Sequence, residues 1–351
     1  RRAALPDEPQ DRLLVLRGAT GELLWADSLI ERRAPLGMHD ALGQIVGSSG
    51  EGAADLLTGR LFTQCHPMTG HTVPWNWIGA IRCGTQNFSR HLALFRSGAA
   101  AFAELDGWPT TANVPGVRPG CTNNLVVADG VLNVPDYTRT CSCSYQHQTS
   151  LGLVHMPEVE MWSYSSLPAP EPGEIRRVGV NFGAPGSRLD RTSETLWLEY
   201  PPQVVPAPQV PIEVETDEDA VWFHQHASII RQDEGGHRWV AASGVEGIRR
   251  IRISGLATES ENGRIGYRLR LHFAEPRAIN PGQRVFDVMV QGQRVLSNFD
   301  VADRAAGSNR LVVAEVEIKA DADGAVEISF QSNGGSLRKP LVCGVEVRAV
   351  E

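Results

Sequence analysis

The residues best able to do chemistry in this chain are cysteines gathered in one stretch. Cys121, Cys141 and Cys143 lie close together in RPGCTNNLVVADGVLNVPDYTRTCSCSYQHQTS, which runs from residue 118 to 150. Neighbouring thiols can bind a metal, form a redox couple, attach a haem or form structural disulfides. Each use has its own spacing, so the sequence can discriminate among the four.

The observed spacing favours disulfides. The haem-attachment string C-x-x-C-H is absent, and C-S-C at 141–143 is not the C-x-x-C of redox pairs. Zinc with His147 as fourth ligand stays open as an alternative, although structural zinc sites prefer two C-x2-4-C pairs. In a strand Cys141 and Cys143 point to one face, so each needs a distant partner. The disulfide candidates are Cys65, Cys83, Cys121, Cys141 and Cys143.

These five candidates are an odd number, so one of them stays free or pairs with a segment outside this chain. Cys343, in the apolar string LVCGVEV, is predicted to be a buried free thiol. Disulfides persist in oxidising compartments. We therefore expect an extracellular, periplasmic or cell-surface protein.

Motifs for catalysis are missing from the sequence, and we predict no catalytic residue. Acidic residues are plentiful, but no spacing singles out the carboxylate pair of a glycoside hydrolase. The strings G-x-S-x-G and H-E-x-x-H and a glycine-rich phosphate loop do not occur. His224 and His226 share one face of a predicted strand, but we interpret them as surface residues and predict no metal site.

Composition excludes some classes of partner. The chain has 351 residues, a formal net charge of −8 and a pI near 5.7. Nucleic acids and anionic membranes both favour basic proteins, so neither is an expected partner. No stretch reaches the roughly 20 apolar residues of a membrane span. Because the chain starts with Arg1, we expect it to be a mature or truncated part of a longer protein.

The pattern of apolar residues predicts an all-β protein. In the first region, LLVLRGATGELLW (13–25) and RLFTQCHPMTGHTVPW (60–75) each contain a Thr-Gly turn and a tryptophan shortly after it. Thr-Gly supplies the positive-φ corner of a hairpin, and the tryptophan can pack between neighbouring sheets. The distance between the two turns is close to the period of propeller blades.

The second region contains short alternating strands typical of an antiparallel sandwich or jelly roll. YRLRLHFAE (267–275) alternates apolar with polar residues, and RVFDVMVQGQRVLSNFDV (284–301) contains two strands around a Gln-Gly-Gln turn. LVVAEVEIKADADGAVEISFQS (311–332) is predicted to be a further hairpin, and PLVCGVEVRAV (340–350) a last strand. The proline-rich segment 167–174 is predicted to be a linker between residues 1–166 and 175–351.

The second region resembles the malectin-like carbohydrate-binding family in VGVNFGAPG, LHFAE, RVFDVMVQGQRVLSNFD and CGVEV. The resemblance implies a β-sandwich that binds sugar through aromatic and polar side chains at one end, without catalytic machinery. Glu275 and Arg284 are predicted to form a structural ion pair. The predicted ligand-binding residues combine aromatic rings with hydrogen-bonding carboxylates. They are Asp190, Trp197, Tyr200, Trp222, Phe223, Trp239 and Asp300. For Asp300, in the string NFD, capping of a turn stays open as the alternative role.

The first region resembles the closing blades of a quinoprotein-type (PQQ-like) β-propeller. A propeller needs about four to eight blades, and this region supplies three or four at most, so we expect an incomplete propeller. Quinone dehydrogenases of this type carry a Cys-Cys disulfide over the cofactor, and no Cys-Cys occurs here. We therefore expect neither PQQ nor another cofactor.

Together these patterns lead to one favoured hypothesis and two alternatives. The favoured one is an exported, non-catalytic protein that binds carbohydrate through its C-terminal sandwich, with avidity from other modules of a longer chain. The first alternative is a propeller-based enzyme, either a quinone-dependent dehydrogenase or a carbohydrate-active enzyme. The second is a structural surface scaffold.

Overall fold

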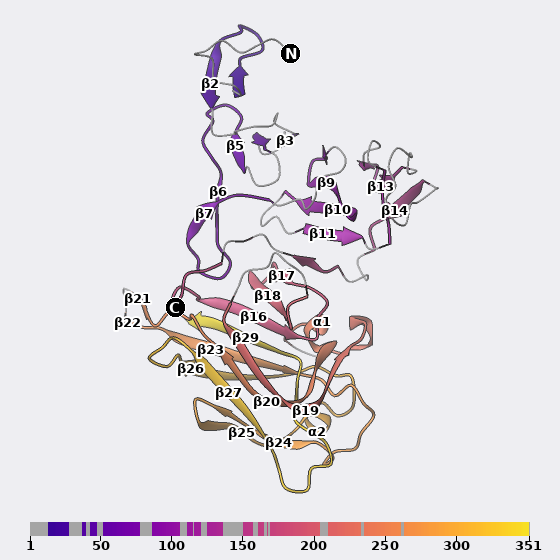
Figure 1. Ribbon diagram of the computed structural model, residues 1–351, viewed down its shortest axis with the longest axis vertical. Coiled ribbons are helices and arrows are strands. Elements are labelled where there is room, and N and C mark those ends of the chain that lie inside the picture. The colour runs from indigo at the N-terminus through magenta and orange to yellow at the C-terminus, as the bar shows by residue number, and fades with distance from the viewer. Residues whose placement is uncertain are drawn as a thin grey trace. The chain divides into compact units, whose positions relative to one another are not determined.

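The computed structural model describes most of the chain, and nearly all of its regular structure is β. The division into compact units assigns residues 1–65 and 71–157 to a first unit, and residues 66–70 and 158–351 to a second. The all-β prediction is confirmed (Figure 1). The described residues are 13–27, 37–39, 43–47, 52–77, 86–105, 111–114, 116–120, 125–135, 150–156, 161–164, 167, 169–203, 210–232, 235–260 and 263–350.

The described strands of the first unit form several small antiparallel sheets. β1 pairs with β2, β3–β4–β5 form a second sheet, β6 pairs with β7, β8–β9–β10–β11 lie side by side, and β12–β13–β14 form another. Their bounds are β1 Leu13–Leu16, β2 Leu23–Asp27, β3 Gly37–His39, β4 Gln44–Val46, β5 Ala53–Asp55, β6 Thr63–Cys65, β7 Thr72–Pro74, β8 Asn87–Phe88, β9 Leu92–Ser97, β10 Ala99–Glu104, β11 Thr111–Val114, β12 Val126–Ala128, β13 Val131–Val134 and β14 Leu151–Val154.

Both predicted Thr-Gly hairpins are present in the structure. β1 and β2 pair around Gly21, and β6 and β7 pair around Gly70, each glycine with positive φ. Trp25 reaches outside its own hairpin, because its Nε1 donates a hydrogen bond to the carbonyl oxygen of Leu56 at 2.9 Å. The tryptophan thus ties one small sheet to the next, as the turn pattern predicted.

The propeller interpretation of the first unit is not supported. A propeller repeats one four-stranded blade, whereas the described strands here pair in sheets of different sizes. A Thr-Gly hairpin with a docked tryptophan is a local motif that suits many β-proteins. The turns therefore predicted the hairpins but did not determine how the sheets assemble.

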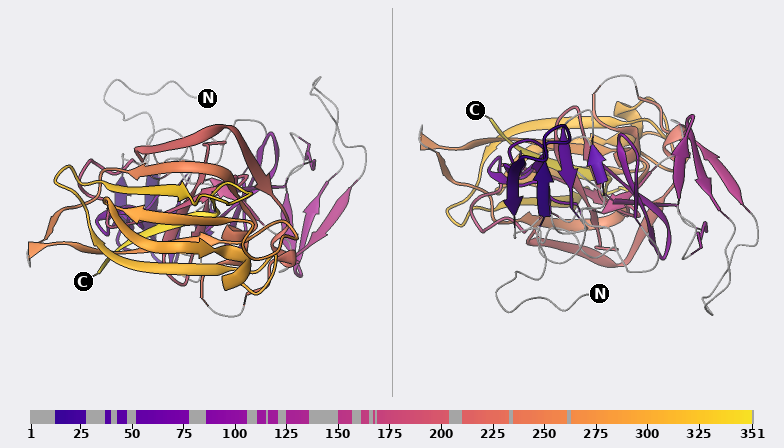
Figure 2. Two further views of the ribbon diagram at one scale, coloured as in Figure 1. Left: turned by 90° about the horizontal axis from the view of Figure 1, so that it is seen from below. Right: turned by 90° about the horizontal axis from the view of Figure 1, so that it is seen from above.

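The second unit is a β-sandwich of two six-stranded sheets (Figures 1 and 2). The first sheet has the order β17–β18–β16–β29–β23–β26, and the second has β19–β20–β27–β24–β25, with β28 also paired to β20. The bounds of their strands are β16 Arg177–Phe182, β17 Arg188–Asp190, β18 Thr195–Tyr200, β19 Ile212–His224, β20 Ser243–Ile253, β23 Gly266–Phe273, β24 Val285–Val290, β25 Gln293–Asp300, β26 Val312–Lys319, β27 Val326–Ser332, β28 Leu341–Val342 and β29 Gly344–Val350.

Short elements complete the second unit. Two single-turn α-helices and one 3-10 turn follow strands or loops at the edges of the sandwich, and a small hairpin projects from it in Figure 1. Their bounds are β15 Ser163–Tyr164, η2 Ala227–Ile229, α1 Arg238–Ala241, β21 Glu259–Ser260, β22 Gly263–Arg264 and α2 Val301–Arg304.

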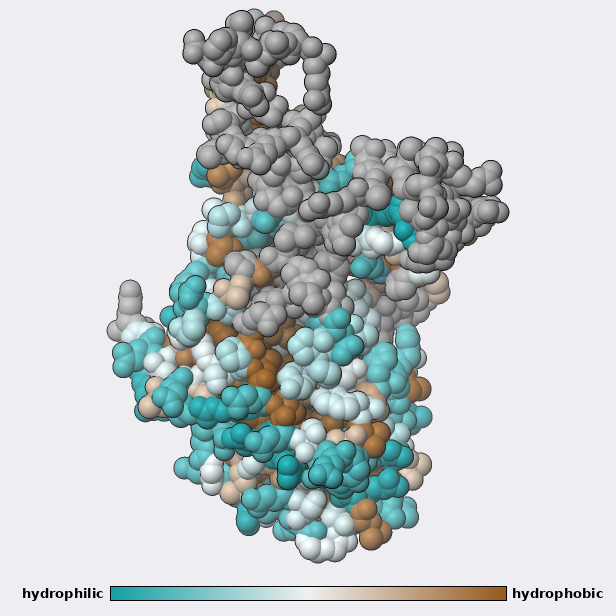
Figure 3. Space-filling view, viewed as in Figure 1, coloured by the Kyte–Doolittle hydropathy of each residue, from teal (hydrophilic) through white to brown (hydrophobic). Residues whose placement is uncertain are grey.

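Alternating apolar residues from both sheets build the core of the sandwich. Tyr267, Leu269, Leu271 and Phe273 of β23 are all buried and face the second sheet, which confirms the predicted alternation. Hydrophilic side chains dominate the face of the second unit shown in Figure 3, with apolar patches between them. The core thus fixes which side chains remain on the outer faces.

One predicted hairpin is wrong in its pairing. The turn at Asp321–Gly324 is present, but β26 pairs with β23 in the first sheet, whereas β27 pairs with β20 and β24 in the second. The connection is therefore an arch between the two sheets. An alternating pattern shows only that a strand has one buried face. A strand has one buried face both when it pairs with the preceding strand in a hairpin and when it lies in the facing sheet, so the pattern does not distinguish the two arrangements.

The division into units differs from the predicted domain boundaries. The second unit begins at Glu158 and also takes in residues 66–70, the turn of the β6–β7 hairpin. The predicted linker 167–174 is tied to the sandwich, since Gly173 N donates to the carbonyl oxygen of Gly255 at 3.1 Å. Leu167 also packs against the core. Leu167 and Gly173 of this proline-rich segment are therefore held against the sandwich.

Candidate functional site

Three aromatic side chains meet at one end of the sandwich. β16 and β18 pair in parallel, and the last pair in their register is Phe182 with Tyr200. Their ring centroids lie 5.9 Å apart, and the Trp222 ring of β19 lies 6.1 Å from Tyr200 and 6.5 Å from Phe182. We call these three residues the end platform.

The three side chains of the end platform differ in how much of their surface is exposed. Phe182 is fully buried, Tyr200 is half-buried, and Trp222 is 39% exposed. The Tyr200 and Trp222 rings are inclined by only 33°. Burial raises the pKa of Tyr200, so its hydroxyl stays protonated at neutral pH and can donate a hydrogen bond. The platform thus presents apolar ring surface together with a polar hydroxyl.

A second group lies on the outer face of the first sheet, and we call it the histidine–tryptophan cluster. The Trp197 ring contacts the rings of His237, Trp239 and His272 at centroid distances of 5.2 to 5.7 Å. Trp162 contacts Trp239 at 6.1 Å. The members of this cluster are Trp162, Trp197, His237, Trp239 and His272.

Glycines on neighbouring strands make room for the Trp197 ring. A Cβ atom on Gly179 of β16 would lie 2.3 Å from Trp197 Cδ2, and one on Gly344 of β29 would lie 3.0 Å from Trp197 Cζ3. The first contact is too close for a real Cβ atom, and the second is tighter than most real Cβ contacts. The ring therefore lies flat over two glycine backbones, with only 1% of its surface exposed.

Charged and polar groups surround the histidine–tryptophan cluster. His237 Nε2 lies 3.5 Å from Asp190 Oδ2, which also accepts a hydrogen bond from Ser193 N at 2.9 Å. Burial acts to raise the pKa of Asp190, but the hydrogen bonds of Ser193 and the nearby His237 hold it below its usual value. Burial lowers the pKa of His237, and Asp190 offsets only part of that effect.

His272 is the most deeply buried ionisable group of the cluster. Burial, reinforced by Arg270 and His237, lowers its pKa to about 3, although the Arg270 backbone slightly favours the charged ring. Neither ring nitrogen has a hydrogen-bond partner of ordinary geometry. His272 is therefore a neutral packing residue at physiological pH.

The structure brings the predicted ligand-binding residues together in two separate groups. Tyr200 and Trp222 meet at the end platform, and Asp190, Trp197 and Trp239 meet in the histidine–tryptophan cluster. The guanidinium of Arg188 lies 4.9 Å from the Trp239 ring centroid, as in a cation–π contact.

Two of the predicted ligand roles need correction. Trp197 is buried, so no sugar can stack on its ring. Asp300 caps helix α2, because its Oδ1 accepts hydrogen bonds from Ala302 N and Asp303 N. Its Oδ2 accepts a hydrogen bond from Gly282 N, so both carboxylate oxygens are engaged within the protein.

Phe223 also has a structural position. Its ring packs partly against the core, and a Cβ on Gly244 would lie 2.7 Å from Phe223 Cζ. Phe223 and Trp222 are adjacent in β19, so their side chains leave opposite faces of the strand. Trp222 is the more exposed of the two.

Sequence reasoning missed Phe182 and the two histidines His237 and His272. Phe182 lies in VGVNFG, whose alternation with Val178 and Val180 could have identified its inward direction. His272 alternates with Arg268 and Arg270, which suggested a solvated face. The rings of Trp197 and His237 pack against His272 and bury it, contrary to that expectation.

The cysteines fall partly within the described residues. Cys65 is an exposed free thiol on β6, and Cys343 is a buried free thiol, as predicted for Cys343. Burial raises the pKa of the Cys343 thiol to about 12, so it is not a reactive thiolate. Cys83, Cys121, Cys141 and Cys143, together with His147, lie outside the described residues.

No helix in the described part of the chain is both long and apolar enough to span a bilayer. No group of three or more His, Cys, Asp or Glu side chains in the same residues is arranged to hold a metal ion.

The predicted structural ion pair is present. Arg284 Nε donates a hydrogen bond to Glu275 Oε2 at 2.7 Å, and both side chains are fully buried. Arg284 also lies 3.2 Å from Glu246 Oε2. The pair holds the loop after β23 to the start of β24.

Comparison with known proteins gives matches to part of the chain only. The "Kinesin-like protein KIN-14E" of Oryza sativa subsp. japonica is 37% identical over 90 residues, which cover 23% of this chain and 8% of that protein. This chain therefore corresponds to a small part of that relative.

Solved structures give distant matches. The ANXUR2 extracellular domain from Arabidopsis thaliana aligns with 13% identity and a TM-score of 0.38, covering 50% of this chain and 48% of that one. A β-glucuronidase of Bacteroides uniformis aligns with 15% identity and a TM-score of 0.39, covering 74% of this chain and 26% of that one.

The family comparison bears on the sandwich. The matched residues include β23 and β26 of the first sheet, β24, β25 and β27 of the second, and the buried Glu275–Arg284 pair. Residues 258–341 of the chain match the model of the malectin domain.

Proposed function

We propose that the second unit binds carbohydrate at the end platform, without catalysing a reaction. The observation that carries this proposal is the exposed Trp222 ring beside Tyr200 at the end of a sandwich whose residues 258–341 match the malectin domain. The face of a pyranose ring is apolar, and its edge carries hydroxyl groups. A flat aromatic surface with a neighbouring hydroxyl matches both features.

Packing beneath the rings supports a rigid platform. Phe182 is fully buried under Tyr200 and Trp222, and the other end of Tyr200 packs against the core. Side chains held in place lose little conformational entropy when a ligand binds. The platform can thus accept a sugar without rearrangement.

The expected affinity is weak for one site. Stacking on one or two rings and a single hydroxyl leaves most of the sugar in water, and such contacts correspond to a Kd of about 1 mM, or roughly 4 kcal/mol. Repeated sites on a longer parent protein would raise the avidity. Asp300 is not part of the proposed site, because its Oδ1 caps α2 and its Oδ2 accepts a hydrogen bond from Gly282 N.

We also propose that the protein acts outside the cytoplasm. This part of the proposal rests on the closely spaced cysteines in the segment 121–143, since disulfides between such cysteines are typical of oxidising compartments. Alkylation of the purified protein without reductant, followed by mass spectrometry, tests it. Four unmodified cysteines besides Cys65 and Cys343 would support disulfides, and six alkylated cysteines would refute them.

A glycan array probed with the full chain tests the binding proposal. We expect at least one neutral glycan to bind, and the Trp222→Ala variant to lose that binding. Leu337→Ala is the control, because it removes an exposed apolar side chain elsewhere in the same unit. If Trp222→Ala binds the same glycan as strongly as the wild type, the end platform is not the site.

A further inference from the structure

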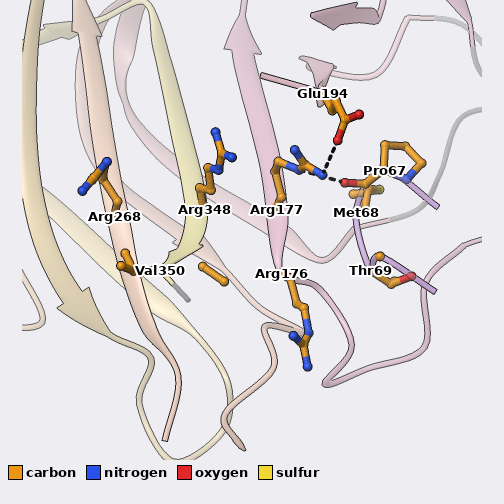
Figure 4. Close-up of a pocket in the computed structure, with 11 residues that line it drawn as sticks. Pro67, Met68, Thr69, Arg176, Arg177, Glu194, Arg268, Arg348 and Val350 are labelled. Carbon is orange, nitrogen blue, oxygen red and sulfur yellow. Dashed lines mark hydrogen bonds and ion pairs between the residues drawn. The ribbon is translucent and has the colours of Figure 1, made fainter. Parts of the chain in front are cut away.

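The first sheet carries a pocket on its outer face, away from its core side. The pocket has a volume of about 520 Å³ and is lined by Arg176, Arg177, Arg268 and Arg348 and by the turn at residues 67–70 (Figure 4). All of these residues belong to the second unit. We call this site the arginine pocket.

One wall of the arginine pocket is fixed by backbone hydrogen bonds. The carbonyl oxygen of Met68 accepts hydrogen bonds from Arg176 N at 2.7 Å and Arg177 N at 3.0 Å. Arg177 Nε donates to the carbonyl oxygen of Pro67 at 3.2 Å. The Met68 side chain is fully buried in the core of the sandwich. The wall is therefore rigid, and Arg177 is a residue that positions it.

Strand register places three of these arginines in a row. Arg348 of β29 pairs with Arg177 of β16 on one side and with Arg268 of β23 on the other. Like charges directly opposite each other on neighbouring strands destabilise a sheet. Stability alone therefore does not explain this row.

The next row on the same face shows the contrast. There Glu346 of β29 pairs with Arg270 of β23, and Arg270 Nη1 lies 3.1 Å from Glu346 Oε2. Thr195 Oγ1 donates a hydrogen bond to the other oxygen of Glu346 at 2.7 Å. Opposite charges thus alternate in that row, whereas the other row has three consecutive arginines, Arg177, Arg348 and Arg268, before Glu317 of β26 follows opposite Arg268.

Neighbouring acids neutralise the row only in part. Arg177 lies 3.4 Å from Glu194, as Figure 4 shows, and Arg268 lies 3.0 Å from Glu315. Within the described residues, no side chain forms an ion pair or hydrogen bond with Arg348. A local excess of positive charge therefore remains in a chain whose formal net charge is −8.

We propose that the arginine pocket binds a sugar-sized organic anion, whose carboxylate or phosphate group is recognised by Arg348 and Arg268. Guanidinium groups donate paired hydrogen bonds to both kinds of oxyanion. A volume of about 520 Å³ falls within the range of small-molecule sites and exceeds what an inorganic ion needs. Pro67 and Val350 add apolar surface for the carbon skeleton of the ligand.

This site is separate from the end platform, since the two share no residue. Its ligand carries a charge, whereas the platform is suited to a neutral sugar ring. The two proposals can therefore fail independently.

Calorimetric titration of the full chain at low salt tests the proposal with glucose 6-phosphate, glucuronate, glucose and inorganic phosphate as probes. We expect one of the two sugar anions to bind at least tenfold more tightly than both glucose and inorganic phosphate. Which of them binds distinguishes phosphate from carboxylate recognition. Added salt should weaken that binding, because the contacts are exposed charges. Equal binding of all anions, or none, would overturn the proposal.

Variants locate the binding. Arg348→Gln and Arg268→Gln are each expected to weaken binding of the positive anion roughly tenfold, the loss typical of one charged hydrogen bond. Arg304→Gln, at an exposed arginine of α2, should leave it unchanged. Circular dichroism checks that each variant is folded. Wild-type affinity in both folded pocket variants would place the anion elsewhere.

Discussion

At the scale of single residues, His272 is the side chain whose burial has the clearest consequence. Its pKa is lowered from 6.5 to about 3, so the unfolded chain takes up a proton at this ring under mildly acidic conditions and the folded chain does not. The free energy of unfolding therefore falls as the pH falls below 6.5.

The His272 prediction can be stated as a difference between two proteins. On going from about pH 6.5 to about pH 5, the ring contributes a loss of about 2 kcal/mol in unfolding free energy, at about 1.4 kcal/mol per pH unit. The His272→Leu variant lacks this contribution, so its stability should depend less steeply on pH. Urea unfolding of both proteins at the two pH values measures the difference, and equal pH dependence would contradict it.

The buried ion pair of Arg284 gives a second prediction at this scale. Arg284→Met leaves the carboxylate of Glu275 buried without its partner, and we expect a loss of about 3 to 5 kcal/mol in unfolding free energy. Arg294→Met is the control, because Arg294 is half exposed in its pair with Asp287 and should cost about 0 to 1 kcal/mol. Urea titration measures both, and similar losses would refute the structural role.

The role of a single residue could be predicted from the sequence where the residues that contact it are close to it in the chain. Glu275 and Arg284 lie near each other in the chain, and their pairing was predicted correctly. Trp197 was predicted to bind ligand because an aromatic residue beside an acidic loop suits sugars. What buries it is Gly179, Gly344 and His237, which come from three other parts of the chain.

At the scale of elements, the packing of β18 against its neighbours depends on Gly179. Gly179→Ala would put a Cβ 2.3 Å from the Trp197 ring, and we expect about 1 to 3 kcal/mol of destabilisation as the ring is displaced. Gly266→Ala is the matched control, because that strand glycine has no atom within 4 Å of the added Cβ. Near-ultraviolet circular dichroism should change only for Gly179→Ala, and unchanged spectra for both would contradict this packing.

The strands themselves were predictable, but their partners were not. Apolar alternation correctly predicted β23 and the β24–β25 hairpin, because each needs only one buried face and a Gln-Gly turn. The same rule wrongly joined β26 to β27, which belong to different sheets. Sheet membership depends on contacts between distant segments, which alternation does not encode.

At the scale of the whole molecule, the chain has two units with separate hydrophobic cores. We expect differential scanning calorimetry to show two unfolding transitions, since separate cores unfold separately. Arg284→Met should lower the midpoint of only one of them, that of the second unit. A single transition that shifts as a whole would show that the units unfold together.

At the end platform, the parallel pairing of β16 and β18 and the edge strand β19 bring Tyr200 and Trp222 together. The most direct measurement is the affinity of the full chain for an array-positive neutral glycan, compared with its Trp222→Tyr and Trp222→Ala variants. We predict a small loss for Trp222→Tyr, which keeps an aromatic face, and more than roughly tenfold for Trp222→Ala. Wild-type affinity in a folded Trp222→Ala variant would contradict the account.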